Sequence, residues 1–320
     1  MRHLISIDDL TDGDLRAIPR RAAEFATALR QRSPIDQPLS GDVVGVYFRK
    51  TSTRTRTAFS VGAVRLGAQI VTFGPNDLQT NTGETIEDTG QVFSRMLDVL
   101  VARTSADPAE LRALADQPRM AVVNAMTQDE HPTQALADLT TMLQRFGRLD
   151  DLNVLYVGEG NNTAAALALA LTRLPGSRLE LRTPPGYGLE QPILERAGAQ
   201  AGRTGATLIE RHDMAGLPRA AQVVYTTRWQ TTGTSKPDPN WRAVFAPFQV
   251  HAGIWRDCPD ALFMHDLPAH RGEEVTAEVL DGPVSIAFDQ AGNKLTSAMA
   301  VLEYCRSGAS IVDREAVAAR

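Results

Sequence analysis

The sequence has little cysteine, no long apolar run and no excess of positive charge. Only Cys258 and Cys305 occur, far apart and without metal-ligand spacing, which argues against a disulfide framework and a zinc site. No stretch reaches the apolar length of a membrane span, and MRHLISIDDL lacks the basic-then-apolar order of a signal peptide. The formal net charge of -5 argues against nucleic-acid and anionic-membrane partners. We therefore expect a cytoplasmic protein whose arginine clusters bind small anions.

The length and residue pattern predict two domains. With 320 residues, 43% of them hydrophobic, the chain can bury a large core and exceeds most single domains. Short apolar segments alternate with helical patterns in both halves of the chain. The expected strands are GDVVGVYF, GAQIVTF, DVLVAR and MAVVNA, then LNVLYV, RLELRT, ATLIE, AQVVYTT, ALFMHDL and SIAF. This alternation predicts an α/β fold with two doubly wound parallel-sheet domains linked by helices.

The predicted boundaries follow from this alternation. We expect a first domain over residues 1–148 and a second over 149–292, with a helix from about residue 133 to 146 between the two series of strands. A C-terminal helix, residues 293–320, is expected to pack back on the first domain.

Hydrogen-bond donors crowd the start of the first domain's second helix. Residues 52–56 read Ser-Thr-Arg-Thr-Arg and lie between an apolar strand and an apolar helix. A helix N-terminus offers free backbone NH groups and partial positive charge, and the side chains add hydroxyl and guanidinium donors. The run therefore predicts a site for an oxyanion such as phosphate. The alternative for each single residue is a capped helix with a solvated arginine.

Two further positions lie where strands end or helices begin. Arg103 closes the strand DVLVAR, at the edge where parallel sheets bind ligands. His131 and Gln134 flank Pro132 at the start of the linking helix, where proline is well tolerated. A histidine there can donate to a carbonyl oxygen, and the glutamine amide can hold a neighbouring NH2 group. Taken alone, His131 also fits a packed or capping role.

These positions together resemble the aspartate and ornithine carbamoyltransferase family. The likeness covers nearly the whole chain, and it is closest to the ornithine branch in GEGNN at 158–162, FAPFQV at 245–250 and LPAHRGEEVT at 267–276. It implies a carbamoyltransferase that needs no metal or organic cofactor. A neutral amine attacks the carbamoyl carbon of carbamoyl phosphate, donors stabilise the charge on the carbonyl oxygen, and phosphate leaves.

The resemblance implies a carbamoyl phosphate site in the first domain. Its expected residues are Ser52, Thr53, Arg54, Thr55, Gln79, Arg103, His131, Gln134 and Lys294. Thr55, Arg103 and His131 would polarise the carbamoyl oxygen, which makes Arg103 and His131 catalytic. Gln79 matches a residue that the family lends from a neighbouring subunit, so the resemblance implies a homotrimer with shared sites.

The acceptor half departs from the ornithine pattern. Thr227 stands where that branch has an aspartate, and Arg228 with Gln230 resembles the acceptor-carboxylate site of the aspartate branch. Asp266 replaces a cysteine, and as a third catalytic candidate it would steady the acceptor ammonium, take its proton or reject an acidic acceptor. The expected acceptor residues are Asn162, Thr227, Arg228, Gln230, Thr231, Asp266 and Leu267, with Thr232 at a further matching position.

We therefore expect carbamoyl transfer to a small amino-acid-like amine that need not be ornithine. Lys294 stands where the ornithine branch has an arginine, which is not a neutral exchange at a forked contact. Two alternatives remain at this point. One is a catalytically silent ligand-binding relative, and the other is an NAD-dependent dehydrogenase, because GEGNNT resembles a dinucleotide turn with Thr163 in place of its third glycine. The turn-rich residues 233–239 are expected to form a mobile flap over the acceptor pocket.

Overall fold

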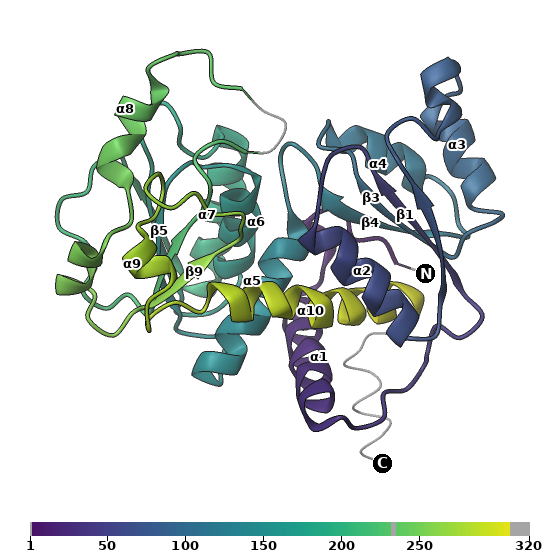
Figure 1. Ribbon diagram of the computed structural model, residues 1–320, viewed down its shortest axis with the longest axis horizontal. Helices are drawn as coiled ribbons and strands as arrows, with labels where there is room; N and C mark the ends of the chain where they lie inside the picture. Colours follow the sequence, from purple (N-terminus) through teal and green to yellow (C-terminus); the bar gives the residue numbers. More distant parts are fainter. Residues whose placement is uncertain (1, 232–234, 308–320) are drawn as a thin grey trace. The chain divides into compact units, whose positions relative to one another are not determined.

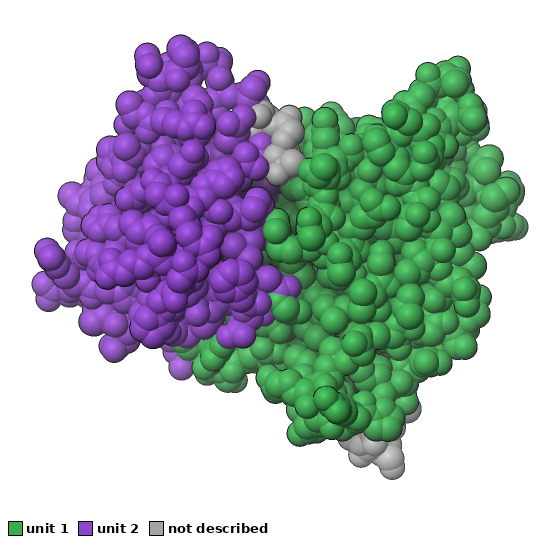
Figure 2. All heavy atoms as spheres, in the orientation of Figure 1, with its two compact units in different colours: residues 1–147, 292–320 green, residues 148–291 purple. Residues whose placement is uncertain are grey.

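The computed structural model describes residues 2–231 and 235–307, and its chain divides into two compact units. Unit 1 comprises the residues up to 147 together with those from 292 onward, and unit 2 comprises residues 148–291 (Figure 2). Within the described ranges, no helix is long and apolar enough to cross a membrane. Each unit is described below by itself.

Unit 1 is built on a four-stranded parallel sheet in the order β2-β1-β3-β4. Its strands are β1 (Val43–Phe48), β2 (Gln69–Phe73), β3 (Val99–Arg103) and β4 (Ala121–Met126). Strands β3 and β4 are buried along their whole length, and apart from Arg103 and Asn124 their residues are apolar. Strand β2 lies at an edge of the sheet and is largely exposed.

The connections of unit 1 are helical (Figure 1). They are η1 (Ile7–Asp9), α1 (Asp12–Gln31), α2 (Arg54–Arg65), η2 (Gln79–Thr82), α3 (Ile86–Phe93), α4 (Pro108–Ala115) and α5 (Pro132–Phe146). Helix α1 is capped by Thr11, whose side chain accepts a hydrogen bond from the Asp14 amide. Helix α4 begins with Pro108 in its first turn, and the side chain of Asp107 caps it by accepting from the Ala109 amide.

The last helix, α10 (Ala287–Ser307), begins earlier than predicted, and the expected strand SIAF is wrong. Ser285 makes only an isolated bridge with Phe263, and the Gln290 amide already donates to the Ile286 carbonyl. A short segment such as Ser-Ile-Ala-Phe, with three apolar residues, does not distinguish a strand from a helix start. From residue 292 onward the helix belongs to unit 1, where Glu303 pairs with Arg21 at 2.7 Å. Residues 308–320 of the predicted helix lie outside the described residues.

Unit 2 is built on a five-stranded parallel sheet in the order β7-β6-β5-β8-β9. Its strands are β5 (Asn153–Val157), β6 (Arg178–Arg182), β7 (Thr207–Arg211), β8 (Val223–Thr226) and β9 (Leu262–His265). Its helices are α6 (Asn162–Leu171), α7 (Gln191–Thr204), α8 (Trp241–Phe245), η3 (Ala246–Phe248), η4 (Ala252–Arg256) and α9 (Ala277–Leu280). The α/β fold of two parallel sheets is therefore confirmed.

The pairing of β8 with β9 in the unit 2 sheet brings two polar residues together. Strands β8 and β9 are adjacent, and Thr226 pairs with His265. The residues that follow, Thr227 and Asp266, therefore leave the sheet side by side at its carboxyl edge. This is the edge at which open parallel sheets bind their ligands.

Candidate active site

In unit 1, the donor-rich turn after β1 meets the end of β3. The register pairs Phe48 with Arg103, so the segment after β1 lies beside the Arg103 side chain. The Nη1 atom of Arg103 donates to Ser52 Oγ at 3.3 Å, and Arg103 is buried. The guanidinium group is thus held at the carboxyl edge of the sheet by the residue that opens the predicted phosphate site.

The remaining residues of this turn form the start of α2. Thr53 precedes the helix and its side chain makes no capping hydrogen bond, Arg54 is the first helical residue, and Thr55 is buried. An uncapped helix start keeps its backbone NH groups available to a bound anion. The geometry matches an oxyanion site more closely than a self-capped helix.

A second group of predicted residues meets at the start of α5. Gln134 Nε2 donates to Asp138 Oδ1 at 2.8 Å, and Gln134 Oε1 accepts a hydrogen bond from Lys294 Nζ. Lys294 arrives from α10 and is buried. The neighbouring Asn293 fixes that helix locally by donating to Thr141 Oγ1 at 3.0 Å. The Gln134 amide is therefore oriented from both ends.

His131 lies within this cationic region and is uncharged near neutral pH. Burial lowers its pKa well below the ordinary value of 6.5, and the positive charges of Lys294, Arg103 and Arg54 lower it further. Its Nδ1 lies 3.3 Å from Thr133 Oγ1. A neutral imidazole still carries one N–H, which can donate to a carbonyl oxygen as negative charge develops there.

Gln79 stands apart from this cluster within the chain. It begins η2, it is exposed, and its Oε1 accepts a hydrogen bond from Thr82 Oγ1 at 2.7 Å. The structure places it on the surface of unit 1.

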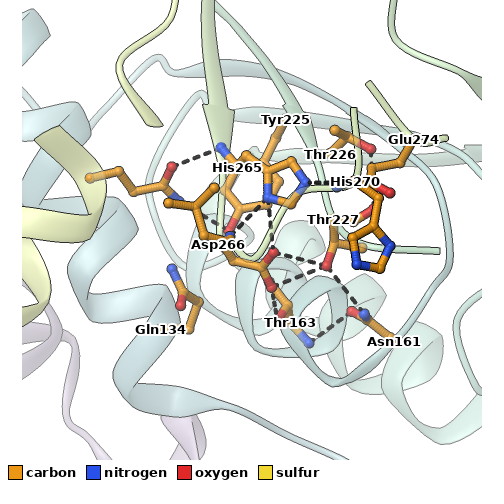
Figure 3. Close-up of polar contacts among 12 residues, drawn as sticks. Gln134, Asn161, Thr163, Tyr225, Thr226, Thr227, His265, Asp266, His270 and Glu274 are labelled. Carbon is orange, nitrogen blue, oxygen red and sulfur yellow. Dashed lines mark hydrogen bonds and ion pairs between the residues drawn. The ribbon is translucent and has the colours of Figure 1, made fainter. Parts of the chain in front are cut away.

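In unit 2, a carboxylate is fixed at the carboxyl edge of the sheet (Figure 3). Thr227 Oγ1 lies 3.0 Å from each carboxylate oxygen of Asp266, and Thr163 Oγ1 donates to Asp266 Oδ2 at 2.9 Å. The three residues come from the end of β8, the end of β9 and the first turn of α6. Position 227 carries a threonine where the ornithine branch has an aspartate, but Asp266, at the end of the neighbouring strand, places a carboxylate next to it.

His265 lies next to Asp266, with its Nδ1 3.4 Å from Asp266 Oδ1, and Glu274 lies on the other side of the imidazole ring. The sequence analysis did not predict a role for either residue. The Leu267 amide donates to His265 Nδ1 at 2.8 Å, and His265 Nε2 lies 3.3 Å from Glu274 Oε1. This arrangement puts the proton of the neutral imidazole on Nε2, toward Glu274. Burial lowers the pKa of His265, but the carboxylates of Asp266 and Glu274 outweigh it and raise the pKa above 6.5.

The backbone after these strands is strained. Ser105, Met126 and Leu267 have φ values of 54°, 145° and 53°, which are uncommon for residues other than glycine. They lie just after β3, at the end of β4 and just after β9. Such conformations cost free energy and cluster at functional sites.

The glycine turn after β5 places two asparagines, Asn161 and the predicted Asn162, at the start of α6. Asn161 Oδ1 caps α6 by accepting from the Thr163 amide at 3.0 Å, and its Nδ2 donates to Thr231 Oγ1 at 3.1 Å. Asn162 is the buried first residue of α6. Gly160 is needed for packing, because a Cβ atom there would lie 2.3 Å from the Gly188 carbonyl carbon.

Arg228 keeps its guanidinium group available for a ligand. It is half-buried and makes no hydrogen bond or ion pair with the described part of the chain. Gln230 follows two residues later and is half-buried. Thr232 and residues 233 and 234 of the predicted flap lie outside the described residues.

Among the residues described, His270, Glu273 and Glu274 form a group whose ligand atoms lie within 4.8 Å of one another. Glu274 Oε1 already accepts from the His270 amide and contacts His265. These contacts give the cluster a structural role, and we assign no metal to it.

Comparison with known proteins agrees with this geometry. Residues 2–144 match the family described as "Aspartate/ornithine carbamoyltransferase, carbamoyl-P binding domain", and residues 150–305 match its "Asp/Orn binding domain". The chain belongs to the aspartate/ornithine carbamoyltransferase family. The family prediction is thus confirmed, and the chain is a carbamoyltransferase.

Individual relatives of this carbamoyltransferase are similar over nearly their full length. It is 37% identical over 305 residues to the ornithine carbamoyltransferase of Caldicellulosiruptor saccharolyticus, covering 95% of this chain and 98% of the relative. The ornithine carbamoyltransferase of Thermococcus kodakarensis is 37% identical over 311 residues, covering 97% and 98%. The solved structure of the Pyrococcus furiosus enzyme superposes with a TM-score of 0.89 at 36% identity, covering 96% and 98%.

Proposed function

We propose that unit 1 binds carbamoyl phosphate and that unit 2 binds a small amino acid whose amine receives the carbamoyl group. The observation that carries this proposal is the buried cluster of Arg103, His131, Gln134 and Lys294, joined to Ser52. It combines cations for a phosphate with an oriented amide and a neutral imidazole for a carbamoyl group. Carbamoyl phosphate carries both groups in one molecule.

The reaction follows from these donors. The amine nitrogen forms a bond to the carbamoyl carbon, the bond from that carbon to the phosphate oxygen breaks, and inorganic phosphate leaves with the bonding electrons. Ser52, Thr53, Arg54 and Thr55 hold the phosphate. Thr55, Arg103 and His131 stabilise the charge on the carbonyl oxygen, while Gln134 and Lys294 hold the carbamoyl amide. An alkyl ammonium of pKa about 10 must first lose a proton, which Asp266 accepts, and the second proton, lost by the nitrogen as the new bond forms, goes to the departing phosphate.

The acceptor is proposed to bind through two opposite charges. Asp266 meets its ammonium group, because the carboxylate is already oriented by Thr163 and Thr227. Arg228 meets its carboxylate, because its guanidinium makes no ion pair within the described chain. The other residues of the acceptor site are Asn162, Thr227, Gln230, Thr231 and Leu267. An acidic acceptor side chain next to Asp266 is disfavoured by like-charge repulsion.

Shared sites in a homotrimer are proposed for unit 1. Gln79 is exposed, as a residue lent to a neighbouring subunit must be. The same unit exposes apolar side chains, among them Val64 at 58%, Val71 at 41% and Met96 at 70%. Such side chains are available to a subunit interface. Sedimentation should show a trimer. The Gln79→Ala variant should remain a trimer in sedimentation but carbamoylate its acceptor more slowly than the wild type.

An acceptor panel tests the proposed function. Isotope-labelled carbamoyl phosphate is offered with ornithine, aspartate, diaminopropionate and putrescine, and the labelled ureido product is measured with phosphate release. We expect an amino acid other than ornithine that carries a side-chain amine, such as diaminopropionate, to react best. Putrescine should react more slowly because it lacks a carboxylate, and aspartate because its side chain is repelled by Asp266. Ornithine reacting best would contradict an altered acceptor. Binding of carbamoyl phosphate without turnover of any amine would instead indicate a silent binding relative.

A further inference from the structure

A lysine ammonium group is buried among aromatic rings in unit 2. The Lys236 side chain is 3% exposed, and its Nζ lies 4.6 Å from the ring centroids of Tyr187 and Phe245 and 5.4 Å from that of Trp241. The same nitrogen lies 2.5 Å from Glu159 Oε1. Lysine is almost never fully buried unless it is paired, and here it has both a carboxylate and three ring faces.

The contacts around Lys236 hold two segments of the chain together. Trp229, just after β8, packs with Trp241 and Phe245 of α8 in one apolar cluster. Glu159 lies in the glycine turn after β5. Lys236 therefore ties the segment that follows β8 to the turn that begins α6.

From Glu159 a line of hydrogen bonds runs to the proposed acceptor carboxylate. Thr231 Oγ1 donates to Glu159 Oε2 at 3.3 Å, and Asn161 Nδ2 donates to Thr231 Oγ1 at 3.1 Å. The same Nδ2 lies 3.5 Å from Thr227 Oγ1, which contacts Asp266. Every link is a described side chain of unit 2, so the order of this network depends on how Glu159 is held.

We infer that Lys236 is a positioning and specificity residue for the acceptor, an inference that rests on the proposed function. Its charge neutralises Glu159, so that the acceptor ammonium is directed to Asp266 and does not meet a second carboxylate. Its position fixes Glu159, and through it Thr231 and Asn161. Without the ammonium group, Glu159 would add negative charge beside the site and repel the acceptor carboxylate.

Four variants of unit 2 test this inference in steady-state assays of the full-length enzyme. Lys236→Met keeps the length of the side chain and removes its charge, and Lys236→Arg keeps the charge. Glu159→Gln removes the carboxylate, alone and combined with Lys236→Met. Arg242→Met is the matched control, since this cation lies over the same Trp241 ring at 4.5 Å but is 61% exposed and does not reach Glu159. Circular dichroism and melting temperature establish that each variant is folded.

We expect Lys236→Met to raise KM for the best amino acid about ten-fold, equivalent to about 1.4 kcal/mol, with KM for carbamoyl phosphate unchanged. Its relative rate with putrescine, which has two ammonium groups and no carboxylate, should rise. Lys236→Arg should restore most of the acceptor KM, and adding Glu159→Gln to Lys236→Met should remove the shift toward putrescine. Arg242→Met should match the wild type.

Two results would overturn the inference. One is an acceptor KM in Lys236→Met equal to that of the wild type, and the other is a putrescine preference that persists when Glu159 is also replaced. If Lys236→Met does not fold, the Glu159→Gln variant tests the inference by itself. It must raise the acceptor KM, because Glu159 holds Thr231 and Asn161, and an unchanged KM would overturn the inference. A wild-type enzyme that carbamoylates no amine would contradict the proposed function as well, so the two failures are distinguishable.

Discussion

Replacing Asp266 with asparagine removes one charge and keeps the shape of the side chain. Asp266 is 15% exposed and is held by Thr163 at 2.9 Å and Thr227 at 3.0 Å. An amide oxygen can accept the same two hydroxyl hydrogen bonds, so the fold should tolerate the change. What the variant loses is the ionic partner of the acceptor ammonium.

The size of this loss follows from the kind of hydrogen bond involved. A hydrogen bond to a charged group contributes about 1.5–3 kcal/mol, which corresponds to about 10- to 150-fold in kcat/KM. We therefore expect Asp266→Asn to lower kcat/KM for the acceptor within this range. KM for carbamoyl phosphate should stay unchanged, because the residues proposed to bind it lie in unit 1.

The assay is steady-state formation of labelled ureido product at varied acceptor and saturating carbamoyl phosphate. Asp281→Asn is the matched control, since this carboxylate of the same unit is 49% exposed and pairs with Arg271. It should leave both kinetic constants unchanged. If a folded Asp266→Asn enzyme retains the acceptor kcat/KM of the wild type, Asp266 does not bind the reacting ammonium.

Three further predictions concern the rest of the site. Below pH 6.5 the unfolded chain binds a proton at His131 and the folded chain does not. The free energy of unfolding should therefore fall on acidification by up to about 1.4 kcal/mol per pH unit. Denaturant unfolding of His131→Gln should lack this contribution to the pH dependence. Lys294→Met should weaken binding of a carbamoyl phosphate analogue about ten-fold or more in calorimetry, since it removes a buried cation and leaves Gln134 Oε1 without that donor. Gly160→Ala should cost about 1–3 kcal/mol of unfolding free energy, because its Cβ would meet Gly188 backbone at 2.3 Å. Gly198→Ala, with nothing within 4 Å, is its control and should not destabilise the protein.

Local patterns were enough to predict most elements of the fold. The alternation of apolar strands with helices predicted both parallel sheets. The prediction of a strand at SIAF failed because its three apolar residues fit a strand and the first turn of α10 equally well. The Gln290 amide donates to the Ile286 carbonyl within the helix, and the Gln290 side chain accepts from the His265 amide of β9. No local sequence pattern reports this second, tertiary contact.

The candidate site was predictable residue by residue, but its connections were not. Gln134 and Lys294 are 160 residues apart and meet only because α10 packs on unit 1. Lys236 lies in a segment rich in turn formers, where a lysine is ordinarily solvated, and its burial depends on rings from α8 and from the turn before α7. The sequence therefore named side chains with the right chemistry and left their partners unidentified.

The adjacency of β8 and β9 changes the meaning of the threonine at position 227. From the sequence, Thr227 indicates the loss of an ammonium partner, because the matching residue of the ornithine branch is an aspartate. In the structure its hydroxyl lies 3.0 Å from both oxygens of Asp266, which leaves the next strand at the same level of the sheet. This edge of the sheet therefore keeps a carboxylate, but the carboxylate is now that of Asp266, which follows β9 and lies between His265 and the strained residue Leu267. In the proposed acceptor site, a carboxylate shifted by one strand would present its oxygens from a different direction. It would therefore select among amines by the position of their nitrogen, without a change in the residues proposed to bind carbamoyl phosphate in unit 1.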